Sequence, residues 1–172
     1  MAGAQTEGVF PLFLRTRGAL ALVVGKGAVA ARKSVQLRSC GFEVEQCEIS
    51  EYPAKRLERY SLAVAATGDR GFNRQMAGDC RACRVPVNVV DDPELCTFYF
   101  GAMARKEPFT VAVSTGGGCP VAGQLLRDRI APLMTDRLSN VAARMGEERE
   151  RWRAQWPNPV ERAAAMRKEL LS

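Results

Sequence analysis

The chain has 172 residues, of which 47% are hydrophobic and 26% are charged, a composition typical of a globular protein. Its apolar runs are too short to cross a bilayer and its first residues lack a secretory signal pattern, so we expect a cytoplasmic protein without a membrane partner. Because the chain contains no histidine, Ser-His-Asp and Cys-His catalysis are excluded, and any general base is an Asp, Glu, Lys, Tyr or Cys side chain.

The first predicted strand is the continuous apolar run Leu20 to Val24, which is typical of a strand buried on both faces. A Gly25–Gly27 turn follows it, and residues 28–39 are predicted to form a helix that Gly41 terminates. The partial alternation of residues 42–49 predicts the second strand.

The next stretch repeats this rhythm. It contains a short helix over residues 52–59, a strand over residues 61–66, a helix over residues 70–84 and a strand over residues 86–90. Strands that alternate with helices predict an α/β fold with a Rossmann-like, doubly wound parallel sheet.

The pattern changes after Asp91. Two β-like runs, residues 97–103 and 109–114, predict a hairpin joined by Ala-Arg-Lys-Glu-Pro, and such an appended hairpin often pairs with a partner chain. Helices are predicted over residues 119–135, 136–152 and 160–171. We therefore expect a Rossmann domain (residues 1–95), a dimerisation region (96–133) and a helical C-terminal domain (134–172).

The turn Gly25-Lys-Gly27-Ala-Val-Ala30 matches GxGxxA between a strand and a helix, the context in which this motif binds dinucleotides. The alternative is a turn that uses glycine for its geometry only. The acid that binds the adenosine ribose is expected about 20 residues on, which leaves Glu45 and Glu48 as candidates. No arginine lies near that strand end, which favours NAD over NADP.

Three segments follow predicted strands and should meet at the carboxyl edge of the sheet: Gly25, Thr67 and residues 88–92. Asp91, at the end of the fourth strand, is positioned to accept a proton beside a bound nicotinamide. The alternative is that Asp91 and Asp92 only cap the turn before Pro93.

The net charge of +6 suggests an anionic partner, whether nucleic acid, a membrane surface or an acidic small molecule, or simply a solvated basic surface. Nucleic acid is not favoured, because basic residues are neither clustered nor interleaved with aromatic ones. Among the six cysteines, Cys80 and Cys83 form the only CxxC, which lacks the further ligands of a zinc site. We expect reduced thiols and no metal site.

Five blocks in this order resemble the precorrin-2 dehydrogenase and sirohydrochlorin ferrochelatase family of siroheme synthesis. They are FPLFL, VVGKGAVAARK, AVAATGDRGFNRQM, VPVNVVDDPELCTFYFGA and VAVSTGGGCPVAGQLLRDRI, and the resemblance covers about Val9 to Leu133. It implies NAD-dependent oxidation of precorrin-2 to sirohydrochlorin, and in some members insertion of Fe²⁺ as a second reaction. It also implies a homodimer with a Rossmann domain, a dimerisation region and a helical C-terminal part.

The resemblance also implies functional residues. Asp91 matches the aspartate that the family uses in dehydrogenation and chelation, and Thr115 matches a serine that is phosphorylated in some relatives. The expected NAD contacts are Gly25, Gly27, Ala28, Val29, Ile49, Ser50 and Thr67. The expected tetrapyrrole contacts are Asn88, Ser114, Thr115, Gly116 and Arg127. Four basic side chains, Arg105, Lys106, Arg127 and Arg129, are candidates for binding the carboxylates of such a substrate by charge complementarity, and a solvated surface accounts for each of them at least as well.

Two departures from the family pattern stand out. The stretch between Ser50 and Ser61 is shorter than in typical members, so one strand or helix of the Rossmann unit is expected to be reduced or missing. The final segment, RWRAQWPNPVERAAAMRKELLS, has no counterpart in the resemblance, which makes Fe²⁺ insertion the less supported of the two reactions. The alternative function is a non-catalytic, dimeric regulator that binds NAD or a tetrapyrrole, and nucleic-acid binding is a third.

Overall fold

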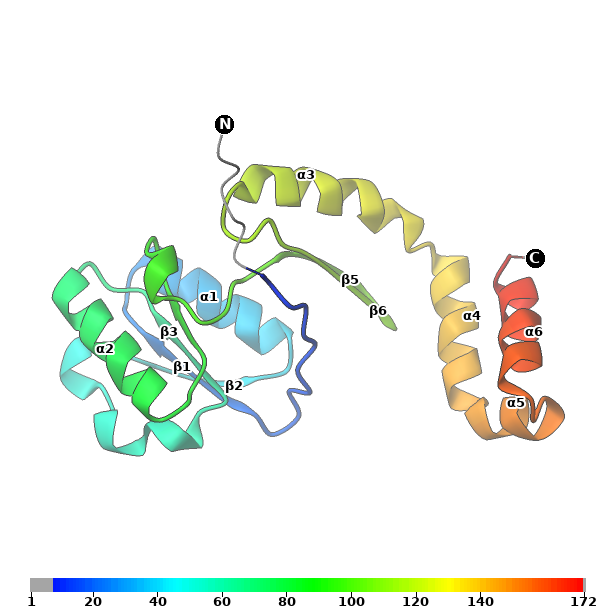
Figure 1. The fold of residues 1–172 in the computed structure, drawn as a ribbon, viewed down its shortest axis with the longest axis horizontal. Helices are drawn as coiled ribbons and strands as arrows, with labels where there is room; N and C mark the ends of the chain where they lie inside the picture. The colour runs from blue at the N-terminus through cyan, green and yellow to red at the C-terminus, as the bar shows by residue number, and fades with distance from the viewer. Residues whose placement is uncertain (1–7, 172) are drawn as a thin grey trace. The chain divides into compact units, whose positions relative to one another are not determined.

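The computed structural model describes residues 8–171, which divide into two compact units, one ending at Phe100 and one beginning at Gly101 (Figure 1). The first unit carries a four-stranded sheet and the second a hairpin with helices. Within residues 8–171, no helix is both long enough and apolar enough to cross a membrane.

The sheet of the first unit is parallel throughout and has the strand order β2-β1-β3-β4. Its strands are β1 (Leu20–Val24), β2 (Glu43–Cys47), β3 (Leu62–Ala65) and β4 (Val87–Val89). The order reverses between β1 and β3, which makes the carboxyl ends of these two strands the topological switch point. The predicted α/β class with a parallel sheet is confirmed.

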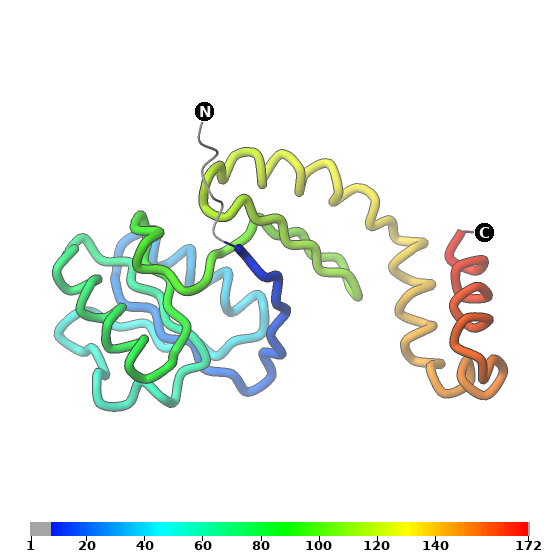
Figure 2. The backbone as a smooth tube through the Cα atoms, viewed as in Figure 1, coloured from blue at the N-terminus to red at the C-terminus, as the bar shows by residue number. Residues whose placement is uncertain are grey.

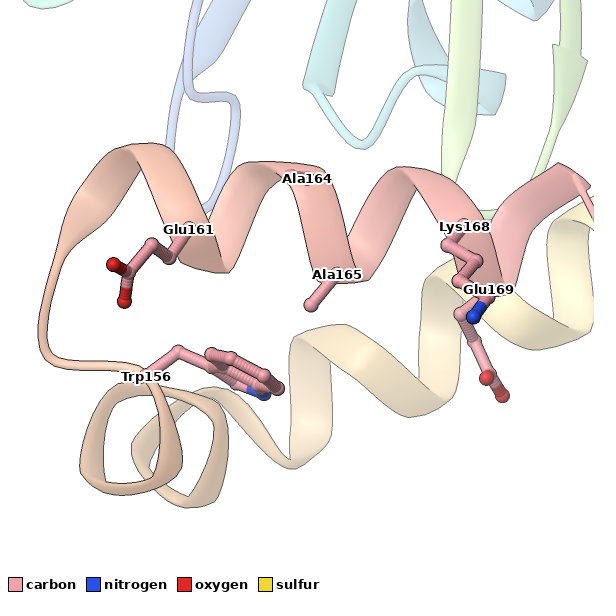
Figure 3. Close-up of a pocket in the computed structure, with 6 residues that line it drawn as sticks. All are labelled: Trp156, Glu161, Ala164, Ala165, Lys168 and Glu169. Atoms are coloured by element: carbon pink, nitrogen blue, oxygen red, sulfur yellow. The ribbon is translucent and has the colours of Figure 1, made fainter.

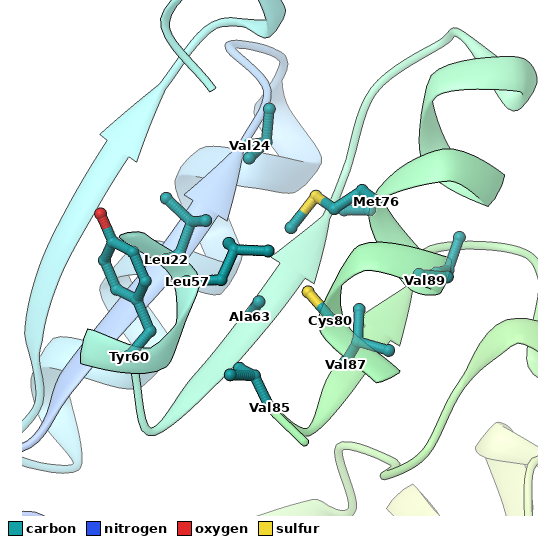
Figure 4. Packing of buried hydrophobic residues seen from close by; sticks show 12 residues of the cluster. Leu22, Val24, Leu57, Tyr60, Ala63, Met76, Cys80, Val85, Val87 and Val89 are labelled. Atoms are coloured by element: carbon teal, nitrogen blue, oxygen red, sulfur yellow. The ribbon is translucent and has the colours of Figure 1, made fainter. Parts of the chain in front are cut away.

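One face of the sheet is covered by α2 (Arg70–Ala82) and by the 3-10 helix Ala54–Arg59 (Figure 4). Leu57 of the 3-10 helix and Met76 and Cys80 of α2 are completely buried there. The connection from β2 to β3 contains this helix, within the short helix predicted over residues 52–59, and a second 3-10 helix, Ile49–Glu51. The reduced connection expected from the short stretch after Ser50 is therefore present.

The opposite face is covered by α1 (Ala28–Ser39), which spans the residues predicted for it. Ala30 and Leu37 of α1 pack on Ala21, Val23 and Val64 of the sheet. Phe98 and Phe100, from the segment after β4, pack against the same cluster. After β4 the chain forms a short 3-10 helix, Pro93–Leu95. The aromatic segment that follows packs on the same face of the sheet as α1.

The second unit begins with an antiparallel hairpin of β5 (Ala102–Lys106) and β6 (Phe109–Val113). The first strand of the hairpin was predicted to begin at residue 97 and begins instead at Ala102. Helix α3 (Pro120–Ile130) packs on the hairpin through Gly123, where a β-carbon would lie 3.5 Å from the carbonyl oxygen of Val113. This is an ordinary van der Waals distance, so α3 and the hairpin are in direct contact there without a steric need for glycine.

The chain continues with a 3-10 turn, Ala131–Leu133, and the helices α4 (Asp136–Glu147), α5 (Arg149–Gln155) and α6 (Pro159–Leu171). The single helix predicted over residues 136–152 is wrong, because the helix breaks at Glu148 and resumes as α5. Helices α4 and α6 run side by side (Figure 2), and Arg144 pairs with Glu169 across them at 2.6 Å.

Candidate functional site: the carboxyl edge of the parallel sheet

Gly25 lies at the switch point, directly after β1. Its φ of +134° is a conformation that L-residues with side chains rarely adopt, and a β-carbon there would overlap the carbonyl oxygen of Ala66, after β3. The Gly25 N–H donates to the carbonyl oxygen of Cys47 at 2.9 Å, so the turn also touches the end of β2. The glycine turn is therefore packed tightly between the two neighbouring strands.

Gly27, by contrast, meets no conformational or steric requirement for glycine within the fold. It is the N-cap of α1 with an ordinary φ of −74°, and no heavy atom lies within 4 Å of where its β-carbon would be. No side chain caps the first turn of α1 and no acidic residue lies in it. The first N–H groups of the helix, at Ala28 and Val29, thus form an open, electropositive helix terminus of the kind that binds phosphate groups.

A side-chain relay holds the glycine turn to its neighbours. Ser34 of α1 donates to the Oε1 of Gln46 at 2.7 Å, and the Nε2 of Gln46 donates to the carbonyl oxygen of Gly25 at 2.9 Å. Because both ends of the Gln46 amide are paired, its orientation is fixed. The turn that would receive a pyrophosphate is thereby pre-organised before any ligand binds.

Glu48 follows the last residue of β2, which is where the fold places a ribose-binding acid. Its two carboxylate oxygens each lie 2.9 Å from the Nζ of Lys26 in the glycine turn. Glu45, the other candidate, lies within the strand and faces Arg59 at 4.0 Å. Ile49 and Ser50 come next, in the 3-10 helix that Glu48 and Glu51 cap reciprocally.

Thr67 lies just beyond β3 and is held by Asn73 of α2. The Thr67 hydroxyl donates to the Oδ1 of Asn73 at 2.6 Å, and the Nδ2 of Asn73 donates to the Thr67 carbonyl oxygen at 3.1 Å. Asp69 caps α2 by accepting from the N–H of Phe72 at 2.9 Å. Asn73 is buried, so this loop is anchored rather than loose.

Asp91 lies at the end of β4 with its side chain exposed and its backbone in the left-handed region, at a φ of +61°. A non-glycine residue in this conformation is strained unless its surroundings hold it there. Asp92 is the N-cap of the next 3-10 helix, but its carboxylate does not cap it; its backbone carbonyl oxygen accepts instead from the N–H of Leu95. The two adjacent acids thus have different surroundings in the structure.

The thiol of Cys96 holds the Asp91 turn in place. Its Sγ lies 3.2 Å from the N–H of Val89, 3.3 Å from the carbonyl oxygen of Val89 and 3.3 Å from the carbonyl oxygen of Asp92. The sulfur therefore contacts the chain on both sides of Asp91. Burial raises the pKa of this thiol, which keeps it protonated and able to donate.

The side chain of Asn88, predicted to contact the tetrapyrrole, is buried beneath the same segment. Its Nδ2 donates to the carbonyl oxygen of Phe98 at 3.1 Å and approaches the Sγ of Cys96 at 3.4 Å. In this arrangement Asn88 supports the segment after β4.

The predicted residues Ser114, Thr115, Gly116 and Arg127 all belong to the second unit. Ser114 Oγ accepts from the N–H of Gly116 at 3.2 Å, and Thr115 Oγ1 accepts from the N–H of Cys119 at 3.1 Å, so the two hydroxyls shape the turn before α3. Arg127 pairs with the adjacent Asp128 at 2.7 Å. The turn is exposed at Ser114 and Gly116, which leaves it open to a ligand or a modifying enzyme.

The other basic candidates of the second unit are also on its surface. Lys106 pairs with Asp136 at 2.7 Å, and Arg105 and Arg129 are exposed. The same unit carries a groove of about 660 Å³ along α6, where Trp156, just after α5, faces Ala165 (Figure 3). It is lined by Trp156, Glu161, Ala164, Ala165, Lys168 and Glu169, and none of the predicted site residues lies in it.

Sequence reasoning missed several residues that shape the site. The roles of Gln46 and Cys96 depend on contacts between segments distant along the chain, which no periodic pattern encodes. Lys26 had a local signal, because it lies inside the glycine motif at the position where a charged side chain reaches the end of β2. Lys33 had a similar signal, since it closes the block VVGKGAVAARK.

Comparisons with known proteins agree with this geometry. A family model described as "Putative NAD(P)-binding" matches residues 44–102, which run from β2 to the start of β5 and include Glu48, Thr67 and Asp91. A solved structure titled "SirC, precorrin-2 dehydrogenase" superposes with a TM-score of 0.66 over 95% of this chain and 93% of that chain, at 14% identity, which shows a shared fold.

Curated relatives are more similar in sequence. A siroheme synthase of Neisseria meningitidis serogroup C is 32% identical over 94% of this chain and 38% of its own length. A siroheme synthase of Methylococcus capsulatus is 36% identical over 87% of this chain and 35% of its own length. The chain thus spans little more than a third of the length of these relatives. On these similarities and its fold, the chain belongs to the siroheme synthase and precorrin-2 dehydrogenase family, in the region that carries the NAD(P)-binding domain.

Proposed function

We propose that the chain is an NAD-dependent dehydrogenase that oxidises precorrin-2 to sirohydrochlorin in siroheme biosynthesis. The observation that supports this most is the placement of Asp91, an exposed carboxylate in a held turn on the same sheet edge as the glycine turn. In the reaction, precorrin-2 gives a hydride to NAD⁺ and a proton to a base, and the products are sirohydrochlorin, NADH and H⁺. In a chain without histidine, Asp91 is the base we propose.

The first unit fits the cofactor. The open N-terminus of α1, with Gly25, Gly27, Ala28 and Val29, suits the pyrophosphate, and Glu48 with Ile49 and Ser50 suits the adenosine ribose. Thr67, fixed by Asn73, lies at the other side of the switch point. The cofactor would supply the hydride acceptor, and these residues would bind and orient it.

The second unit supplies polar and basic groups for the substrate. Precorrin-2 carries carboxylates around its rim, and a chain with a net charge of +6 attracts such a ligand. Ser114, Thr115, Gly116 and Arg127 are the proposed contacts, with modification of Thr115 as a means to block them. We further propose a cytoplasmic homodimer that uses the hairpin region for dimerisation, with the domain boundaries near residues 95 and 133, and Fe²⁺ as the substrate of an additional chelatase reaction.

The test is NADH formation from precorrin-2 and NAD⁺ by the wild-type chain and by Asp91→Asn. The amide keeps the size of the carboxylate and removes its basicity, so we expect kcat to fall roughly 10²- to 10⁴-fold while the Kd for NAD stays unchanged. Full activity of Asp91→Asn would exclude Asp91 as the base. Wild-type protein that binds NAD and sirohydrochlorin without turnover would point instead to a non-catalytic regulator.

A further inference from the structure

Lys33 occupies an unusual environment on α1. Its side chain is half-buried, and its Nζ lies 3.8 Å from the centroid of the Phe100 ring. The ring of Phe98 lies beside that of Phe100, with centroids 5.3 Å apart. The ammonium group thus lies against a small aromatic surface formed by the segment that follows β4.

This cation has no anionic partner in the part of the chain that the structure describes. The ion pairs there involve Lys26, Arg59, Lys106, Arg127, Arg144, Arg151 and Arg153, but not Lys33. The neighbouring Arg32 adds a second positive charge. Burial lowers the pKa of Lys33 and Arg32 lowers it further, as expected for a cation that has lost water without gaining a counter-ion. The aromatic ring replaces only part of the lost hydration.

Lys33 also lies close to the Asp91 turn. The segment that carries Phe98 and Phe100 begins at Cys96, whose sulfur contacts the chain on both sides of Asp91. The charge of Lys33 lowers the pKa of the Cys96 thiol, against the larger, opposite effect of burial, which places the ammonium near this sulfur. A ligand beside Asp91 is therefore within the electrostatic reach of Lys33.

We propose that Lys33 and the ring of Phe100 form a subsite for one peripheral carboxylate of an acidic tetrapyrrole. This proposal rests on the proposed function and adds a substrate-binding residue to it. A carboxylate would supply the missing counter-ion in a partly desolvated position, where a charge-assisted hydrogen bond is stronger than at the surface. The aromatic rings would contact the apolar edge of the macrocycle that carries that carboxylate.

The test compares Lys33→Met with Arg32→Met. Methionine keeps an unbranched apolar stem and removes the charge, while the Arg32 control removes a charge one residue away on an exposed position. We expect Lys33→Met to raise the Kd for sirohydrochlorin and the KM for precorrin-2 about 10- to 100-fold, the loss of one charge-assisted hydrogen bond. We expect Lys33→Met to leave the KM for NAD unchanged. Arg32→Met should change the Kd for sirohydrochlorin less than about 3-fold, and Lys33→Arg, which keeps the charge, should keep most of the affinity.

Thermal unfolding separates binding from packing. Removal of an uncompensated, half-buried charge should leave the Tm of Lys33→Met equal to or above that of the wild type, whereas a purely structural cation–π contact predicts a lower Tm and unchanged ligand affinity. That second pattern would overturn the subsite. Equal sirohydrochlorin binding by wild type and Lys33→Met would also overturn it and leave the proposed function intact, whereas wild-type protein that binds no tetrapyrrole would overturn the proposed function itself.

Discussion

The carbonyl oxygen of Ala66 occupies the space that a β-carbon on Gly25 would need. This contact joins the loop after β1 to the loop after β3, the two strands between which the sheet order reverses. The positive φ of Gly25 adds a second, independent requirement for glycine. Gly25 is therefore required by the fold itself, whereas the open space at Gly27 is available to the proposed cofactor.

The two glycines should consequently respond differently to substitution. We expect Gly25→Ala to destabilise the fold by about 2 kcal/mol or more, which lowers the Tm by roughly 4–8 °C for a chain of this size. Gly27 has an ordinary φ, and a β-carbon there would meet no other atom of the protein. We therefore expect Gly27→Ala to leave the Tm unchanged and to raise the KM for NAD, because the added methyl group would occupy space that the proposed cofactor needs. Thermal unfolding and steady-state kinetics of both variants test this, and equal losses of stability would contradict it.

Asp91 and Arg84 are the two described non-glycine residues with a positive φ, at +61° and +58°. Glycine at either position should relieve strain, so we expect Asp91→Gly and Arg84→Gly each to stabilise the fold by up to about 1 kcal/mol. Only Asp91→Gly should lose dehydrogenase activity. Chemical denaturation measures the stability of both variants, and NADH formation measures their activity. Loss of activity in Asp91→Gly alone would show that the strained conformation at Asp91 serves function, whereas equal activity in both variants would exclude Asp91 from the active site.

Some parts of this architecture follow from local sequence and others do not. Helix α1 runs from Ala28 to Ser39 as predicted, because glycine turns at both ends delimit it. The break at Glu148 was missed: Gly146, two residues before it, is the local signal, but it lies inside α4 and no proline follows it closely. Residues 97–101 were predicted as strand because of their aromatic and apolar side chains. In the structure, Phe98 and Phe100 pack against the parallel sheet, and the backbone of this segment forms no strand.

The site shows the same division. A glycine motif after a buried strand predicts the position of the turn, and strand order brings Gly25, Thr67 and Asp91 to the same edge. The sequence left Glu45 and Glu48 as candidates for the ribose-binding acid. The structure shows that β2 ends at Cys47, so that only Glu48 lies beyond the end of the strand. The contacts of Cys96 with Val89 and Asp92 arise because the chain reverses direction after β4. Secondary-structure propensities do not predict such contacts.

Cys96 should act as a positioning residue for Asp91. We expect Cys96→Ala to lower kcat about 10-fold with an unchanged KM for NAD, because it leaves the N–H of Val89 and the carbonyl oxygen of Asp92 without their sulfur contacts. Cys96→Ser keeps a donor and an acceptor and should recover most of the rate. Wild-type kcat in the alanine variant, or equal losses in both variants, would contradict the positioning role.

The pair formed by Lys26 and Glu48 should determine the choice of cofactor. We expect Glu48→Gln to raise the KM for NAD about 10-fold and to improve the use of NADP, because the carboxylate no longer repels a 2′-phosphate and Lys26 is released to bind it. The double variant Glu48→Gln/Lys26→Met should lose the gain with NADP. Glu45→Gln is the matched control. A change of cofactor preference in that variant would show that Glu45, and not Glu48, determines the choice of cofactor.

The cysteines should differ sharply in reactivity. Burial raises the pKa of Cys80 to about 12 and that of Cys47 to about 11, so both are almost entirely thiol at pH 8 and should alkylate slowly. Cys119 is exposed and should be labelled first. Mass spectrometry after timed exposure to iodoacetamide measures the order, with denatured protein as the control. Fast labelling of Cys80, or a Cys80–Cys83 disulfide under mild oxidation, would show that the CxxC is redox-active after all.

The short connection between β2 and β3 has a consequence for solubility. In the part of the chain that the structure describes, β2 is one of the two edge strands, so its outer backbone groups have no neighbouring strand to pair with. An uncovered edge of this kind invites pairing with another molecule, and charged side chains discourage it. Glu43 and Glu45 lie on this five-residue strand, so replacing both with valine should create an apolar edge segment and cause aggregation. On this argument, Glu43 and Glu45 protect the edge of the sheet against aggregation, a role separate from ligand binding.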